Sequence, residues 1–111
     1  MKVFKAIILL VLVVGMCSCK MQSDVSFTLV QYNVGVFDKY EDSSIDGIAR
    51  VVRELGANVV TLNEIDSCTT RTGQVDQLAA FAEEMDGWNH HYAAAMPYRG
   101  GAYGVGVASS P

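Results

Sequence analysis

A strand–helix–strand pattern in the middle of the sequence most limits what this chain can fold into. Residues 26–34 (SFTLVQYNV) are rich in β-branched and aromatic side chains, and residues 58–65 (NVVTLNEI) are almost continuously apolar, which predicts two strands. Between them, apolar residues recur at helical spacing from Ile45 to Leu55, and Gly56 is placed to end that helix. Two strands joined by one helix are most simply parallel neighbours with a right-handed crossover.

The remaining residues extend this pattern. Ser43 is expected to begin the first helix, helped by Asp46 three residues later in a weak capping box. The resulting order, β-α-β-α-β-β, predicts an α/β (α+β) fold. The other expected segments are loops at 35–42 and 66–73, a helix at 74–86, and strands at 89–96 and 102–109 joined by a Gly-containing hairpin connection.

The N-terminal segment has the features of an export signal. Two lysines precede an unbroken apolar run from Ala6 to Val14, which is too short to cross a bilayer, since a spanning helix needs about twenty residues. The cysteines that follow are typical of a lipoprotein signal, in which a Cys becomes the acylated N-terminus. We favour Cys19 over Cys17, because Cys19 has the small Ser18 before it. An ordinary secreted protein with incidental cysteines is the alternative.

This signal predicts the domain organisation and the location of the protein. We expect residues 1–18 to be a signal peptide, 19–25 a tether and 26–111 a folded domain. The protein would then be exported and anchored by lipid to a bacterial membrane, in the periplasm or at the cell surface. We expect it to be a monomer.

The charge of the mature segment bears weakly on its partners. Without the two lysines of residues 1–18, the eight basic side chains fall to six against twelve acidic ones, a formal charge of −6. The basic residues are scattered, whereas a protein that neutralises many phosphates usually has a stripe of Lys and Arg. Nucleic acid is therefore possible as a partner but not favoured.

The predicted parallel strands bring two polar residues together. Asn33 lies at the carboxyl end of the first strand and Glu64 at that end of the second. Because the carboxyl ends of parallel strands open onto the same rim, where open α/β sheets usually bind ligands, we expect these side chains to meet there.

Four short motifs, in order, resemble those of a known family. They are TLVQYNVG, VVTLNEID, DSCTTRTG and GAYGVGVASSP, and together they span Phe27 to Pro111. This series is similar to successive motifs of the endonuclease/exonuclease/phosphatase family, whose members hydrolyse phosphate esters with Mg²⁺ or Mn²⁺. Their substrates include DNA, inositol phosphates and sphingomyelin. The resemblance implies a partial DNase I-like β-sandwich flanked by helices, with residues 26–111 as the N-terminal half of the domain.

The resemblance also implies roles for individual residues. Glu64 would be the metal-ligating carboxylate, a ligand type that Mg²⁺ prefers, and Asn33 would orient the metal site and the phosphate. Arg71 could contact substrate phosphate through its bidentate fork, or be a solvated loop residue. Asp66 could touch the metal through water, although we favour a loop residue that accepts backbone hydrogen bonds. The alternatives for Glu64 and Asn33 are a surface residue ending a strand and a turn-favouring Asn.

Several other conspicuous side chains have simpler interpretations. Cys68 has no His or second Cys at metal-ligand spacing, so we interpret it as a bystander. His90 and His91 are adjacent on a strand and should point to opposite faces, one exposed and one packed. Trp88 is expected in the core.

The family's other catalytic parts, an Asp-x-Asn motif and a terminal Asp-His pair, do not occur in residues 1–111. We therefore expect the parent protein to be a Mg²⁺- or Mn²⁺-dependent phosphoester hydrolase and this chain, as an isolated fragment, to have no turnover. The alternative is a non-catalytic lipoprotein that uses the scaffold to bind a ligand or partner. We also expect exposed apolar surface and an unpaired sheet edge.

Overall fold

The computed structural model describes residues 24–39 and 43–111, which form one four-stranded mixed sheet with two α-helices packed against it. The α/β (α+β) prediction is confirmed. Along the sheet the strand order is β1-β2-β4-β3. The elements are β1 (Leu29–Asn33), the short 3-10 helix η1 (Gly35–Phe37), α2 (Ile45–Glu54), β2 (Val59–Ser67), the 3-10 helix η2 (Thr70–Thr72), α3 (Gln77–Glu84), β3 (Asn89–Tyr98) and β4 (Gly101–Ser109).

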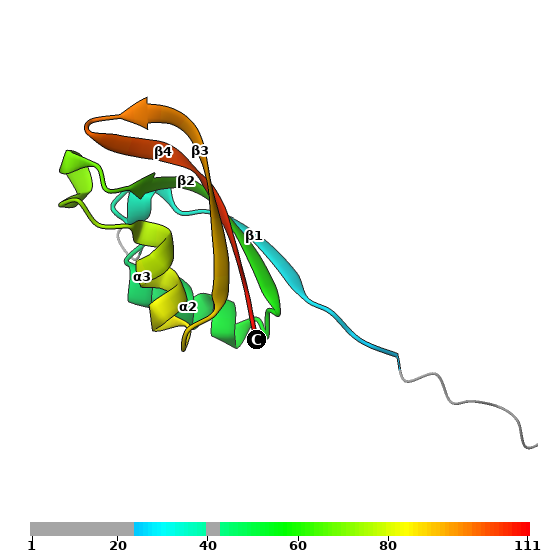
Figure 1. The fold of residues 1–111 in the computed structure, drawn as a ribbon. Helices are drawn as coiled ribbons and strands as arrows, with labels where there is room; N and C mark the ends of the chain where they lie inside the picture. The colour runs from blue at the N-terminus through cyan, green and yellow to red at the C-terminus, as the bar shows by residue number, and fades with distance from the viewer. Residues whose placement is uncertain (1–23, 40–42) are drawn as a thin grey trace, which may run out of the picture.

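Both helices cover the same face of the sheet (Figure 1). The hydrophobic core lies between the helices and the sheet. Alternation along the strands turns every second apolar side chain toward the helices, while helical spacing turns one stripe of α2 and one of α3 toward the sheet. The side chains of this core that are at most 2% exposed include Ile48 and Val52 of α2, Leu78 and Phe81 of α3, and Val60, Leu62 and Ile65 of β2.

The strand pairing agrees with the βαβ prediction. β1 and β2 are parallel neighbours, with Leu29 opposite Val59 and Asn33 opposite Asn63. β1 is shorter than the predicted 26–34, because its partner begins only at Val59. β2 runs on to Ser67, past the predicted end at residue 65, because β4 continues to pair with it as far as Ala102.

Both helices begin later than expected. Ser44, rather than Ser43, caps α2, since its hydroxyl accepts the Gly47 N–H at 3.2 Å. Residues 74–76 are not helical, because Gln74 lies in a turn with a positive φ of 62° and the Cys68 N–H donates to the Val75 carbonyl at 2.9 Å. The carboxylate of Asp76 then caps α3 by accepting the Ala79 N–H at 3.1 Å.

The face of the sheet away from the helices is uncovered among the described residues. Leu29, Val105 and Val107 on this face are 56%, 45% and 37% exposed, in agreement with the apolar surface that was expected. Because residues 24–39 and 43–111 form a single sheet, the DNase I-like sandwich stays a prediction.

The predicted export signal, residues 1–18, and the lipidation site Cys19 lie outside the described residues, so they stay predictions. Within the described ranges, no helix combines the length and the apolar character needed to cross a membrane.

Candidate functional site

Asn33 and Glu64 meet at the carboxyl ends of the two parallel strands. The Asn33 Nδ2 group donates to Glu64 Oε1 at 3.0 Å, and Asn33 Oδ1 accepts the Gly35 N–H at 3.1 Å. The predicted meeting of these side chains is confirmed, whereas their roles in catalysis stay predictions. The amide nitrogen faces the carboxylate, so this geometry favours Asn33 as the residue that orients Glu64.

A β-bulge puts Glu64 at the rim of the sheet. The register between β2 and β4 shifts between Asn63 and Ile65, and Glu64 is the extra residue, with a positive φ of 57°. Strict alternation after Leu62 would have turned Glu64 toward the core. The bulge instead keeps Leu62 and Ile65 buried together and leaves the Glu64 side chain 34% exposed. Its Oε2 lies 3.9 Å from Lys39 Nζ.

The loop that follows β1 has an unusual backbone beside this carboxylate. Val36 and Phe37 both have positive φ, 53° and 54°, a conformation that is strained for residues other than glycine. Such residues persist only where their surroundings hold them, and here the Phe37 ring stacks on Phe81 of α3 with centroids 6.3 Å apart.

Gln77 connects this loop to β2, and its role was not predicted from the sequence. It is buried, its Oε1 accepts the Asp66 N–H at 2.8 Å, and its Nε2 donates to the Val36 carbonyl at 2.7 Å. The available signal was its position four residues before Phe81, which puts a polar side chain on the apolar face of α3. A buried glutamine in such a place needs partners for both ends of its amide.

Asp66 and Arg71, which were expected to be separate loop residues, form an ion pair. Asp66 is the penultimate residue of β2 and fully buried, so its expected position in a polar loop is wrong. Its carboxylate accepts Arg71 Nε at 2.6 Å, Arg71 Nη2 at 2.8 Å and the Thr69 hydroxyl at 2.6 Å. These hydrogen bonds hold the pKa of Asp66 below its ordinary value despite its burial, and those from Arg71 have the largest effect.

The same ion pair corrects the interpretation of Arg71 as a solvated loop residue. Its guanidinium lies over the rings of Tyr98, at 4.5 Å, and Tyr103, at 5.6 Å. Burial and the nearby Glu64 carboxylate raise the pKa of the Tyr103 hydroxyl, so this phenol stays protonated. Two arginine nitrogens are bound to Asp66, and Nη1 is not part of that pair, so contact with a phosphate stays a prediction.

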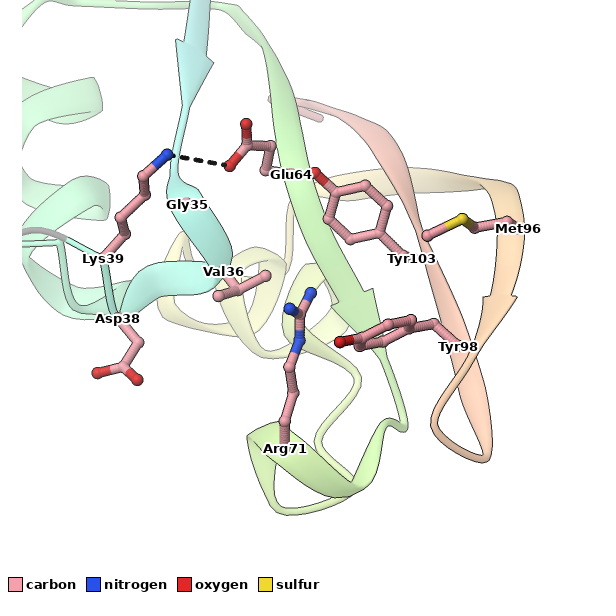
Figure 2. A pocket seen from close by; sticks show the side chains of 9 residues that line it. All are labelled: Gly35, Val36, Asp38, Lys39, Glu64, Arg71, Met96, Tyr98 and Tyr103. Carbon is pink, nitrogen blue, oxygen red and sulfur yellow. Dashed lines mark ion pairs between the residues drawn. The ribbon is translucent and has the colours of Figure 1, made fainter.

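These side chains surround an open pocket of about 310 Å³ (Figure 2). Glu64 and Lys39 lie on one side of it, Arg71 and Tyr98 on the other, and Tyr103 between them. The pocket is lined by Gly35, Val36, Asp38, Lys39, Glu64, Arg71, Met96, Tyr98 and Tyr103.

The remaining predicted residues lie away from this pocket. His90 and His91 are both exposed, so the expectation that one would be packed is wrong. β3 is an edge strand, and His91 faces the uncovered side of the sheet, where no element packs on it. Trp88 is half-buried against the core, as expected, and Cys68 is exposed.

The donor groups described at this site would suit Mg²⁺ or Mn²⁺ better than zinc. Among the described residues, no three His, Cys, Asp or Glu side chains are grouped so that they could hold a metal. Zinc usually needs such a group, whereas Mg²⁺ keeps several waters and is bound by one or two carboxylates together with substrate phosphate. Glu64, partly exposed and oriented by Asn33, fits the second case.

Comparison with known proteins assigns no family to the chain. No protein-family model matches it, and neither a curated protein nor a solved structure matches it significantly. The function must therefore be argued from the geometry of the pocket and from the motifs.

Proposed function

We propose that the protein to which these residues belong hydrolyses phosphate esters with Mg²⁺ or Mn²⁺, and that Glu64 holds the ion. The observation that carries this proposal is the 3.0 Å hydrogen bond between Asn33 and Glu64, made where two parallel strands end beside a pocket with cationic side chains. The order of the four motifs, which resembles the endonuclease/exonuclease/phosphatase family, supports the same chemistry.

The residues of the chain would prepare the metal site in a simple way. Asn33 fixes one oxygen of Glu64 and leaves Oε2 facing the pocket side on which Lys39 lies. A bound ion would draw charge from a non-bridging phosphate oxygen and stabilise the charge that develops as the ester breaks. An ion held by Glu64 would compete with the 3.9 Å contact between this carboxylate and the Lys39 ammonium.

The cationic side chains of Lys39 and Arg71 would then attract the phosphate of the substrate. Lys39 and Arg71 line the pocket on opposite sides, so an anionic group between them is attracted by both. The ion pair with Asp66 and the ring of Tyr98 hold the guanidinium of Arg71 in one orientation. A group fixed in advance loses little freedom when the phosphate binds, which favours binding in a defined orientation.

Activity of the full-length parent protein tests this proposal. With Mg²⁺ and a generic phosphodiester such as bis(p-nitrophenyl) phosphate, we expect Glu64→Gln to lower kcat/KM roughly 100-fold. Glu83→Gln, an exposed change on α3, is the matched control and should leave kcat/KM unchanged. Equal activity of Glu64→Gln and Glu83→Gln would remove Glu64 from the mechanism.

A second function is binding of a phosphate-bearing ligand or partner without turnover. The observation that favours it is that only two carboxylates, Glu64 and Asp38, line the pocket, and that residues 24–39 and 43–111 contain no group of three or more possible metal ligands. In this case calorimetry would detect phosphate-ester binding that Glu64→Gln leaves intact, and the parent protein would release no product.

A further inference from the structure

The wall of the pocket beside Glu64 is apolar and aromatic. Met96 of β3 pairs with Tyr103 of β4, and both residues line the pocket together with Tyr98 and Val36. Met96 is 47% exposed, although methionine side chains are usually buried in the core of a domain. Figure 2 shows its side chain extending toward the ring of Tyr103. The pocket therefore offers an uncovered apolar surface.

Charged groups border this surface, since the Arg71 guanidinium lies 4.5 Å from the Tyr98 ring and 5.6 Å from the Tyr103 ring, whereas Met96 lies on the side of Tyr103 away from Glu64 (Figure 2). Glu64 and Lys39 are on the side of β1 and η1, and the Arg71 guanidinium is held between Asp66 and the ring of Tyr98. A phosphate placed within reach of the Glu64 rim and the two cations would direct its ester substituent toward Met96 and Tyr103. The chemistry of that substituent is then set by what these two side chains can contact.

We propose that this pocket binds an ester of phosphate with a single planar aromatic group, whose ring packs against Met96 and Tyr103. The inference rests on the proposed function for the phosphate, and it names the class of substrate. A thioether contacts an aromatic ring favourably, and a tyrosine ring stacks on another in an offset or edge-to-face arrangement. A polyol substituent would instead gain no hydrogen bond from the side chains of Met96 and Val36.

The size of the pocket agrees with a small ligand. About 310 Å³ is at the lower end of the range for small-molecule sites. One ring and one phosphate fit this volume, whereas a polymer would have to continue out of the pocket.

NMR titration of the purified chain without metal tests the inference apart from catalysis. The probes are phenyl phosphate, glycerol phosphate and inorganic phosphate, observed at the Met96 methyl group and the Tyr103 ring. We expect phenyl phosphate to bind at least about tenfold more tightly than glycerol phosphate. Met96→Ala should weaken phenyl phosphate about two- to tenfold and leave inorganic phosphate unchanged. Val107→Ala, on the uncovered sheet face outside the pocket, is the matched control.

Two results would overturn the inference. One is equal binding of phenyl and glycerol phosphates, or no binding of either. The other is an equal effect of Met96→Ala and Val107→Ala on phenyl phosphate. Failure of the proposed function has a different signature, which is turnover by the parent protein that does not depend on Glu64. Selective binding of phenyl phosphate at Met96 would support the aromatic site even then.

Discussion

Replacing Gln77 by Met tests whether one buried amide holds the loop beside the pocket. Methionine has nearly the same length and volume, so the packing of α3 is kept, but both hydrogen bonds of the amide are lost. The Asp66 N–H and the Val36 carbonyl, at 2.8 and 2.7 Å, would then lack their partners. The buried Asp66 N–H left unsatisfied costs about 1–3 kcal/mol and the part-buried Val36 carbonyl costs less, so we expect a loss of roughly 2–4 kcal/mol in the free energy of unfolding.

This loss is large compared with the total stability of a small domain, about 5–15 kcal/mol. It corresponds to a fall in Tm of at least about 10 °C for a domain of this size. Urea denaturation followed by the fluorescence of Trp88, the single tryptophan and half-buried, measures it. Gln31→Met, at an exposed glutamine on β1, is the control and should cost less than about 0.5 kcal/mol.

Amide hydrogen exchange localises the effect. In Gln77→Met the Asp66 amide should lose its protection relative to amides in the centre of β2, because its acceptor is gone. The strained residues Val36 and Phe37 should relax, since only the stack of Phe37 on Phe81 still holds them to α3. If Gln77→Met unfolds at the same urea concentration as Gln31→Met and the Asp66 amide stays protected, the reasoning about this bridge is wrong.

Three further predictions concern pH, packing and solubility. Arg71 holds the pKa of Asp66 below its ordinary value of 3.8, so the stabilisation of the fold by this ion pair is present above that value and is lost as the pH falls through the lower folded-state pKa. Below pH 4 the urea midpoint should therefore fall less steeply with pH in Asp66→Asn than in the wild type, and equal steepness in the two proteins would contradict this. Gly106→Ala should cost about 1–3 kcal/mol in thermal unfolding, because the new Cβ would lie 2.7 Å from Leu78 Cδ2; an unchanged Tm would show that α3 shifts freely. Val107→Thr should raise the protein concentration at which light scattering detects aggregation, because it reduces the uncovered apolar surface, and should leave Tm unchanged, because it keeps a β-branched residue in the strand. Aggregation at the same concentration as the wild type would mean that this face of the sheet is not responsible.

The sequence was sufficient to predict the features that depend on periodicity and connectivity. Helical spacing predicted the buried side of α2 at Ile48 and Val52, but Leu55, expected on the same face, lies after the end of the helix and is 55% exposed. The strand–helix–strand order predicted that β1 and β2 are parallel neighbours. From that pairing alone, Asn33 and Glu64 were expected at one rim, where they form a 3.0 Å hydrogen bond. The side-chain direction of Glu64 that permits this bond depends on the β-bulge.

The features that were missed depend on contacts between distant residues. The β-bulge at Glu64 exists because β4 pairs with β2 on both sides of it, and nothing in the residues around position 64 indicates where that register shifts. Asp66 reads as a loop residue because a carboxylate is rarely buried, and only Arg71, five residues later, makes its burial possible. Gln77 has one partner 11 residues away and another 41 residues away.

The bulge has a consequence for how the protein can change. Because Glu64 is an additional residue between two correctly alternating halves of β2, the buried side chains before and after it keep their places when another residue that tolerates its positive φ of 57° replaces it. Substitutions at this position, glycine included given the positive φ, can therefore remove or alter the chemistry of the rim at little cost to folding. The hydrophobic core and the polar rim of the sheet can thus be varied independently, by mutation or by design.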